Sequence, residues 1–281
     1  MTLYFAPTSS ECRKKIASWL DDITVLLLTY NEAANIKRTL DRLRWAKRII
    51  VVDSFSSDET CEIAREYENV ELVQRHFDNH ADQWSYGLER VHSEWVLSLD
   101  ADYQITDSFV REIRTIIPLQ MVHAYFARFK YCVHGQPLRA TLYPPRAVLF
   151  RRSRCRFEQE GHTQVLRIDG QHGWLQSPVY HDDRKSLSHW LRAQDRYVGL
   201  EARHLLTASS SGLNFADRLR LWILPAPFLV FFYTLLVKGL ILDGWPGWYY
   251  AFQRTLAEIL LSLRLIETRF KIRNNAQSRS N

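Results

Sequence analysis

The chain has 281 residues, 46% of them hydrophobic and 13% aromatic, which suits one large domain or a domain with an appendage and excludes a disordered protein. Its 37 Lys and Arg against 31 Asp and Glu give a formal charge of +6, which suggests an anionic partner such as phosphate, nucleic acid or an acidic membrane surface. Four cysteines lie far apart without a CxxC pair, so neither a disulfide framework nor a structural zinc site is indicated, and we interpret them as reduced cytosolic thiols.

The first 22 residues, MTLYFAPTSSECRKKIASWLDD, form a predicted N-terminal extension (1–22). They carry charges where a secretory signal needs a continuous apolar stretch, so we do not expect export. At the other end, the polar tail NNAQSRSN (274–281) is predicted to be disordered.

From residue 23 onward, short apolar runs alternate with longer stretches of helical pattern. The predicted strand and helix pairs are 23–29 with 33–43, 48–53 with 58–67, 70–74 with 80–92, and 94–100 with 107–117. Unbroken runs of Val, Ile and Leu are typical of buried parallel strands, and helices between them imply right-handed βαβ crossovers. The sequence therefore predicts an α/β fold with a Rossmann-like, mostly parallel sheet and helices on both faces.

The second half of the chain has a different pattern. AYFARFKYCVHGQPLRATLY (124–143) indicates strands around a turn at Gly135. RAVLFRR (146–152) and HTQVLRID (162–169) indicate two further strands, and a helix is predicted from Ser186 to Leu206.

Polar residues follow three of the predicted parallel strands. They are TYNE (29–32), DSFSSDET (53–60) and the Asp100-Ala101-Asp102 sequence. Each cluster alone fits a helix cap, as Asp58 does, but ligands of open parallel sheets bind at the carboxyl ends of the strands. Three such clusters at one edge therefore favour a binding site.

Asp100 and Asp102 suggest the chemistry of that site. In an extended segment, residues i and i+2 point the same way, so both carboxylates would lie on one side and repel each other unless a cation sits between them. Mg²⁺ or Mn²⁺ held by one or two carboxylates usually completes its shell with phosphate oxygens. The pair therefore predicts a metal-bound diphosphate substrate.

These motifs carry a family resemblance. TYNE, VVDSFSSDET and LDAD, together with Gln83 in DQWSYGL, resemble the signature of family 2 glycosyltransferases with the GT-A fold over residues 23–206. The order and spacing of three motifs are far more specific than a DxD pair alone. Within that family the chain resembles bacterial glycosyltransferases of the lipopolysaccharide core and of lipid-linked glycans.

The resemblance implies a role for each matched position. Thr29 and Asn31 are expected beside the nucleotide base and ribose, and Asp53 is expected to accept from the base, typically uracil. Asp102 is the expected ligand of Mg²⁺ or Mn²⁺, with Asp100 at the sugar or ribose. The full set expected to bind the nucleotide-sugar is Thr29, Asn31, Glu32, Asp53, Asp58, Arg75 and Asp100.

The catalytic base stays open at this stage. Relatives carry a His-Glu pair where this chain reads EGHTQV, which puts His162 in register and Thr163 in place of the acid. Threonine cannot act as the base, so the expected catalytic residues are Glu160, Asp182 and His162. The segment HDDRKS (181–186) fits a solvated helix cap equally well.

The most apolar stretch is LWILPAPFLVFFYTLLVKGLIL (221–242), in which Lys238 is the only charge. Its length would just span a hydrocarbon core of about 30 Å. Pro225, Pro227 and Lys238 interrupt it, so we expect a helix embedded in one leaflet, with a spanning helix or an ordinary core helix as alternatives.

A second stretch, 250–270, is amphipathic. Its apolar positions at helical spacing are Leu256, Ile259, Leu260, Leu263 and Ile266. Basic residues among them suit an anionic membrane surface, and a helical hairpin or a dimer interface is the alternative.

The sequence thus predicts a GT-A domain (23–212) followed by membrane-associated helices (213–273). The resemblance implies a metal-dependent, inverting transferase, peripheral or monotopic at the cytoplasmic face of the inner membrane. It would move a sugar from a UDP-linked donor to a lipid-linked saccharide acceptor in cell-envelope glycan synthesis. The alternative is a catalytically degenerate donor-binding module that serves another membrane enzyme. Nucleic acid is not an expected partner, because no recognised motif supports it.

Overall fold

The computed structural model describes residues 19–116, 120–160, 163–208 and 213–278, and contacts divide the chain into two units. The first unit contains residues 1–130, 143–159 and 164–184, and the second contains 131–142, 160–163 and 185–281. This division groups α6 (Leu187–Thr207) with the C-terminal helices, whereas the sequence predicted a boundary after residue 212.

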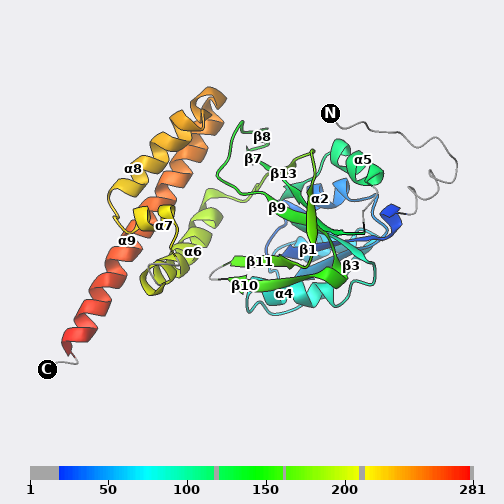
Figure 1. The fold of residues 1–281 in the computed structure, drawn as a ribbon, viewed down its shortest axis with the longest axis horizontal. Coiled ribbons are helices and arrows are strands. Elements are labelled where there is room, and N and C mark those ends of the chain that lie inside the picture. Colours follow the sequence, from blue (N-terminus) through cyan, green and yellow to red (C-terminus); the bar gives the residue numbers. More distant parts are fainter. Residues whose placement is uncertain (1–18, 117–119, 161–162, 209–212, 279–281) are drawn as a thin grey trace. The chain divides into compact units, whose positions relative to one another are not determined.

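The first unit is built on a seven-stranded sheet with the order β12-β6-β9-β4-β1-β2-β3, of which β1, β3 and β9 are labelled in Figure 1. Its strands are β1 (Ile23–Thr29), β2 (Ile49–Asp53), β3 (Val70–Gln74), β4 (Trp95–Asp100), β6 (Val122–Ala127), β9 (Arg146–Arg151) and β12 (Gln171–Trp174). β1 is parallel to β2 and β4, and β2 is parallel to β3, while β9 runs antiparallel between β4 and β6. The sheet is mixed: its parallel part formed by β4, β1, β2 and β3 is the one predicted from the sequence, and β12 also pairs parallel with β6.

Both faces of this sheet are covered. One face packs against α2 (Ile36–Arg42), α3 (Thr60–Arg65) and α5 (Asp107–Thr115). The other packs against α4 (His80–Leu88) and against β10 (Cys155–Glu160) and β11 (Thr163–Ile168), as Figure 1 shows. Val25 and Leu27 of β1 point to the first face and Leu26 to the second. Alternate residues meet different apolar layers, which is why the strand is an unbroken apolar run.

The end of the predicted N-terminal extension belongs to this core. Trp19 is 9% exposed and packs edge-on against Trp95, with ring centroids 5.2 Å apart. Its indole N–H donates to the Ile113 carbonyl at 2.5 Å. Residues just before β1 therefore help to fix α5 against the sheet.

Four further strands form a second sheet with the order β5-β13-β7-β8. In the first unit, β5 (Tyr103–Gln104) pairs antiparallel with β13 (Val179–His181). Between β5 and β13 in the chain, β7 (Phe129–Val133) pairs antiparallel with β8 (Gln136–Pro137). The turn residues His134 and Gly135 have φ angles of +48° and +83°, the left-handed region that a tight hairpin requires. The predicted turn at Gly135 is confirmed.

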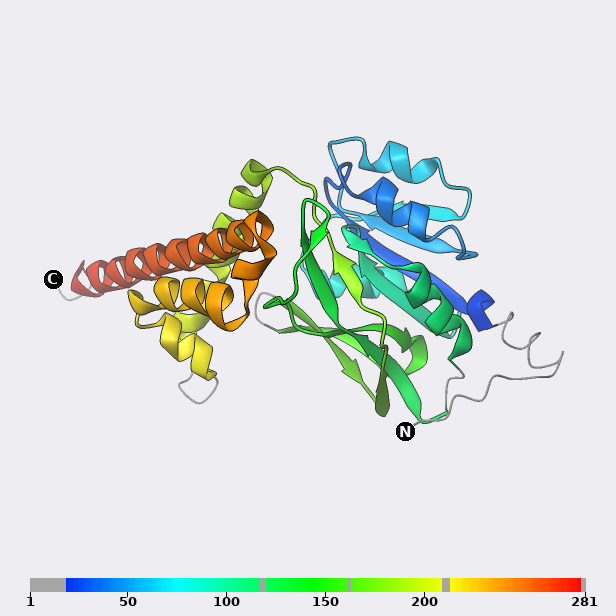
Figure 2. The same ribbon diagram turned by 90° about the horizontal axis from the view of Figure 1, so that it is seen from above.

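The second unit is helical. After α6 come α7 (Phe215–Arg220), α8 (Pro225–Phe232), a π-helical turn η2 (Tyr233–Val237), a 3₁₀ turn η3 (Leu240–Asp243) and the long α9 (Trp245–Ser278). α6 and α8 both pack against α9, and Figures 1 and 2 show α8 alongside the first part of α9. The stretch 221–242 is thus broken into short elements. One of them, α8, begins at Pro225, a proline expected to interrupt the stretch. In the part of the chain that the structure describes, no helix is long and apolar enough to cross a bilayer.

The two faces of α9 have different surroundings. Leu261 and Leu265 are buried in a core with Val198 and Leu205 of α6. The apolar positions predicted from the helical spacing lie mostly outside this core. Of these, Leu256, Ile259, Leu263 and Ile266 are 36–58% exposed, and only Leu260 packs against the core. α9 therefore carries apolar side chains on its packed face and on its open face.

Many other large apolar side chains of the second unit are exposed. Those that are more than half exposed are Phe215, Trp222, Leu224, Phe228, Phe232, Leu236, Val237, Leu242, Trp245, Phe252, Leu263 and Phe270. They come from α7, α8, α9 and the turns between these helices. Such a concentration exceeds the scattered apolar residues of an ordinary protein surface.

Candidate active site

The three polar clusters singled out in the sequence lie at one edge of the sheet. β1, β2 and β4 are parallel neighbours, with Thr29 opposite Asp53 and Leu28 opposite Asp100. Their carboxyl ends therefore coincide, and this edge is where open α/β sheets bind ligands.

The Asp53 carboxylate is fully buried and organises the loop after β2. Its Oδ1 accepts hydrogen bonds from the hydroxyls of Thr29 and Ser56, and its Oδ2 accepts from the Ser56 N–H (2.8 Å) and Gln74 Nε2 (3.1 Å). Burial raises the pKa of Asp53, but these hydrogen bonds outweigh burial and hold the pKa below its usual value. The ionised carboxylate thereby links β1, β2 and β3.

Hydrogen bonds also tie the loop after β1 to the loop after β2. The Asn31 N–H donates to Ser56 Oγ at 2.8 Å, and the Ala33 N–H donates to Asp58 Oδ2 at 3.1 Å. Asp58 Oδ1 accepts from the N–H of Thr60, the first residue of α3, at 3.1 Å. Asp58 therefore supports the start of α3 and also holds the neighbouring loop.

Arg75 and Gln83 flank the loop after β2. Arg75 Nη1 donates to Gln83 Oε1 at 2.7 Å, and Nη2 pairs with Asp78 at 2.8 Å. Gln83 Nε2 in turn donates to Ser54 Oγ at 3.0 Å. The two residues noted in the sequence thus contact each other, and Gln83 of α4 holds this loop through Ser54.

The aspartate pair is brought beside a histidine that the sequence analysis missed. Asp100 ends β4, and Ala101 and Asp102 form the turn into β5. Pairing of β5 with β13 places His181 opposite Tyr103, and His181 Nε2 lies 3.0 Å from Asp102 Oδ2. Burial lowers the pKa of His181, but Asp102 more than compensates, so its pKa lies above the ordinary value.

The rings of Tyr103 and Tyr143 lie beside His181. The hydroxyls of Tyr103 and Tyr143 are hydrogen-bonded to each other. The ring centroid of Tyr143 lies 5.0 Å from that of His181, and the centroid of Tyr103 lies 5.3 Å from it. Burial and the nearby Asp100 raise the pKa of both phenols, which therefore stay neutral at ordinary pH.

Arg146, the first residue of β9, adds a positive charge to the same edge. β9 pairs antiparallel with β4, with Leu149 opposite Leu97, so the register brings Arg146 level with Asp100. Its Cζ lies 4.8 Å from the ring centroid of Tyr143. Burial lowers the pKa of Arg146, but the nearby phenols and aspartates raise it, and the guanidinium is charged.

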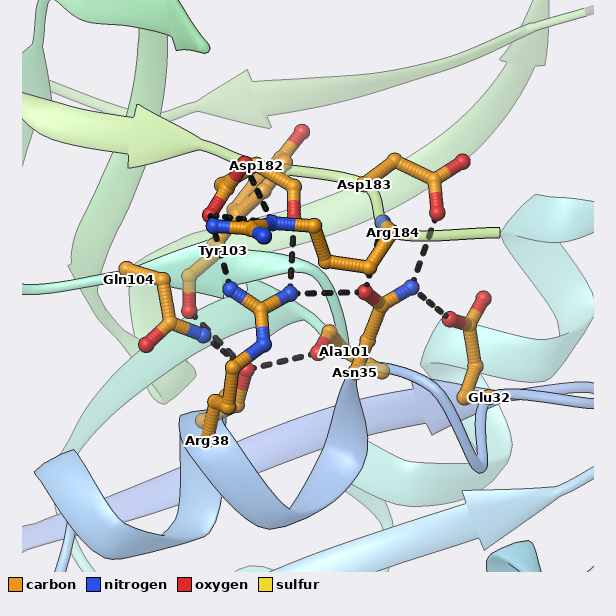
Figure 3. Close-up of polar contacts among 10 residues, drawn as sticks. Glu32, Asn35, Arg38, Ala101, Tyr103, Gln104, Asp182, Asp183 and Arg184 are labelled. Atoms are coloured by element: carbon orange, nitrogen blue, oxygen red, sulfur yellow. Dashed lines mark hydrogen bonds and ion pairs between the residues drawn. The ribbon is translucent and has the colours of Figure 1, made fainter. Parts of the chain in front are cut away.

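Asp182 lies in a polar cluster between β13 and α2 (Figure 3). The residue is 5% exposed, and its carboxylate binds Arg38 Nη1 at 2.7 Å and Arg184 Nε at 3.0 Å. Glu32 belongs to the same cluster, because its Oε2 accepts a hydrogen bond from Asn35 Nδ2 at 2.8 Å. Glu32 and Asp182 are thus connected by hydrogen bonds through Asn35 and Arg38.

The other expected catalytic residues lie on or beside the β10–β11 hairpin. Glu160 is the last residue of β10, and its side chain falls outside the described part of the chain, as does His162. The nearby Glu158 carboxylate pairs with Arg167 at 2.9 Å and Arg156 at 2.7 Å, which hold its pKa below the usual value.

A divalent cation fits the pair of Asp102 and His181. Asp102 Oδ2 and His181 Nε2 lie 3.0 Å apart, within hydrogen-bond distance, and two adjacent ligands of an octahedral ion held at about 2.1 Å have about the same spacing. Within the described ranges, no group of three or more His, Cys, Asp or Glu side chains is arranged to hold a metal ion. An ion at this pair would take its remaining ligands from water or phosphate oxygens.

Comparison with known proteins relates the chain to glycosyltransferases. Residues 24–159, from β1 to β10, match the family model described as glycosyl transferase family 2. An uncharacterised glycosyltransferase of Rickettsia bellii is 29% identical over 126 residues, which are 44% of this chain and 42% of that protein. One of Rickettsia felis is 28% identical over 109 residues, 38% of each chain. The chain therefore matches less than half the length of these curated relatives.

A solved structure shares the fold. A mannosyltransferase from Pyrobaculum calidifontis, in complex with GDP-Man and Mn²⁺, aligns with a TM-score of 0.51 over 87% of this chain and 87% of its own. The two sequences are 17% identical. The likeness concerns the fold, an α/β architecture consistent with the expected GT-A class.

Proposed function

Because residues 24–159 belong to glycosyltransferase family 2, we propose that the chain transfers a sugar from a nucleoside-diphosphate donor to a lipid-linked saccharide, with inversion at the anomeric carbon. The observation that carries this proposal is the contact between Asp102 and His181 at the edge where β1 and β2 also end. A cation-binding pair beside two polar loops is what a sugar diphosphate requires.

The two loops are proposed to hold the nucleoside. Tyr30 and Phe55 follow β1 and β2 and are 48% and 45% exposed, so they offer aromatic faces to a base. Phe55 has a φ of +59° and stacks on His76 with ring centroids 4.2 Å apart. Asp53 then supports these loops from inside, because its oxygens accept hydrogen bonds from Ser56 of the loop and from Gln74. The donor is proposed to be UDP-linked, as in the family members that the sequence resembles.

The diphosphate is proposed to lie against Asp102, His181 and Arg146. Mg²⁺ or Mn²⁺ bound by Asp102 and His181 would neutralise the leaving diphosphate. Arg146 adds a permanent charge at the same edge, where its guanidinium would bind phosphate oxygens. Asp100 is proposed to accept hydrogen bonds from the ribose or the sugar.

In the proposed reaction the acceptor hydroxyl attacks the anomeric carbon. A new carbon–oxygen bond forms, the bond from the anomeric carbon to the diphosphate breaks, and a carboxylate takes the hydroxyl proton. Asp182 is poorly suited to take it, because both of its oxygens bind arginines. Glu160 is therefore the proposed base, with His162 as the neighbouring alternative.

Donor turnover tests this function. The purified chain, given Mn²⁺, UDP-glucose or UDP-N-acetylglucosamine and a membrane extract as acceptor, should release UDP and label lipid. Asp102→Ala should lower kcat/KM by at least about 100-fold, because an ion contributes several kcal/mol to leaving-group stabilisation. Asp169→Ala, at a side chain that is 80% exposed, should leave it unchanged.

The alternative has its own signature in the same assay. Binding of UDP with Mn²⁺ but no turnover with any donor or acceptor would identify a degenerate donor-binding module and rule out the transferase. Absence of both binding and turnover would rule out both functions.

The second unit is proposed to hold the chain at the cytoplasmic face of the inner membrane. Its exposed apolar side chains include Trp222, Phe228 and Trp245, and tryptophan is favoured where lipid meets water. Exposed basic residues such as Arg269 and Lys271 in α9 would meet anionic headgroups. A lipid-linked acceptor would be presented at that surface.

A further inference from the structure

Asp182 is a buried carboxylate held by two guanidinium groups. Arg38 Nη1 binds its Oδ2 at 2.7 Å, and Arg38 Nη2 also donates to the Asp182 carbonyl at 2.8 Å. Arg184 Nε lies 3.0 Å from both carboxylate oxygens, and Arg184 Nη2 lies 2.9 Å from Oδ2. A carboxylate buried in this way is strongly destabilising unless its partners are present. The ion pair of Arg38 and Asp182 therefore fixes the segment that follows β13 onto α2.

The same segment carries the cation-binding pair. Asp182 directly follows His181, and its N–H donates to the Asp102 carbonyl at 3.0 Å. From α2, the Thr39 hydroxyl donates to the Ala101 carbonyl at 2.6 Å. α2 thus contacts the aspartate turn through Thr39 and the histidine segment through Arg38.

Asn35 completes the cluster, and it is fully buried. Its Oδ1 accepts hydrogen bonds from Arg38 Nη2 at 2.8 Å and from the Arg184 N–H at 2.9 Å. Its Nδ2 donates to Asp183 at 2.9 Å. As Figure 3 shows, the side chains from α2 and those after β13 converge on one another. Asn35 therefore holds Arg38 and Arg184 in the positions in which they bind Asp182.

We infer that Arg38 and Asp182 are positioning residues that hold His181 against Asp102, so that the affinity for a divalent cation depends on this ion pair. The inference rests on the proposed function, which places the cation at Asp102 and His181. It assigns Asp182 a different task from the catalytic base that the sequence suggested. Groups that orient metal ligands typically change metal affinity by about 10- to 100-fold when they are replaced.

Mn²⁺ binding measures this dependence directly. Free Mn²⁺ is titrated by electron paramagnetic resonance against wild type, Arg38→Gln, Asp182→Asn and the double variant, each with saturating UDP. Each single variant should weaken Mn²⁺ binding by about tenfold or more. The double variant should be no weaker than the worse single variant, because both changes break the same contact.

Two controls separate positioning from general damage. Arg44→Gln and Asp41→Asn break an exposed Arg–Asp pair at the end of α2 (2.7 Å), and they should leave Mn²⁺ affinity unchanged. Arg38→Lys keeps the charge with fewer hydrogen bonds and should recover part of the affinity. It also serves as the test variant if Arg38→Gln fails to fold, as judged by its thermal unfolding.

The outcomes that would overturn the inference are distinct. Wild-type Mn²⁺ affinity in Asp182→Asn and Arg38→Gln would remove the positioning role while the transferase proposal stands. Loss of turnover in Asp182→Asn alone, with Mn²⁺ affinity kept, would identify Asp182 as the base. A wild-type chain that binds neither UDP nor Mn²⁺ would overturn the proposed function, and the positioning role with it.

Discussion

The ionised carboxylate of Asp53 is a structural component of the edge that we assign to the donor. It is fully buried, and its pKa in the folded chain is depressed. A group of this kind stabilises the fold above its unfolded pKa, and this contribution is lost as the pH falls through the folded pKa. Asp53→Asn should therefore lower the free energy of unfolding at pH 7 by about 1–3 kcal/mol.

The acid dependence provides the check. Urea unfolding of wild type and Asp53→Asn should differ most at neutral pH, and the gap should shrink below about pH 4, the unfolded value for aspartate. A difference in unfolding free energy that stays constant from pH 7 to pH 3 would mean that ionisation of Asp53 does not stabilise the fold. Asp78→Asn, at an exposed partner of Arg75, provides the comparison.

The sequence predicted which polar residues at the ends of long strands lie at the candidate site, but it did not predict the one at the end of a short strand. Thr29, Asp53 and Asp100 end apolar runs of five to seven residues whose parallel pairing is implied by their composition. His181 ends a strand of three residues that pairs with one of two. Strands this short have no detectable periodicity, so only the structure brings His181 to Asp102.

Among the helices, the start of α9 contains a close approach that only glycine permits. A Cβ on Gly247 would lie 1.8 Å from the carbonyl oxygen of Leu240 in η3. Gly247→Ala must therefore push η3 away from α9 and should destabilise the second unit by about 1–3 kcal/mol. Gly199→Ala in α6, where a Cβ meets nothing within 4 Å, should instead stabilise it by about 0.5–1 kcal/mol. Thermal unfolding followed by circular dichroism compares the two, and a lower melting temperature for Gly199→Ala than for Gly247→Ala would contradict this reading.

α9 also shows the limit of helical periodicity as a guide to packing. The spacing of Leu256, Ile259, Leu263 and Ile266 correctly predicted a helix, yet these side chains are exposed. The packed face is formed by Ala257, Leu261 and Leu265, among others. Both sets recur every three or four residues, so the pattern reveals two apolar faces without revealing which one meets α6.

For the whole molecule, the exposed apolar surface of the second unit predicts reversible binding to membranes. The chain should sediment with vesicles that contain phosphatidylglycerol, and less with phosphatidylcholine alone, since each basic side chain near an anionic leaflet contributes about 1 kcal/mol. Trp222→Ser combined with Phe228→Ser should reduce the bound fraction severalfold. Met121→Ser, at an exposed residue of the first unit, should not.

Self-association is the competing explanation for this surface. Analytical ultracentrifugation without lipid distinguishes the two, because a stable dimer that ignores vesicles would mean that a second copy covers the apolar side chains. A monomer or a loose oligomer that disperses in detergent and still binds vesicles agrees with the membrane proposal.

The brief pairing of β5 with β13 has a practical consequence for protein engineering. The segment shared with the family ends at residue 159, whereas the histidine partner of Asp102 is residue 181. A chimera cut at residue 159 would inherit the two loops proposed to bind the nucleotide, the two aspartates and Arg38, but not His181, Asp182 or Arg184. Exchanging the proposed donor site between relatives therefore requires exchanging residues 179–184 together with the sheet.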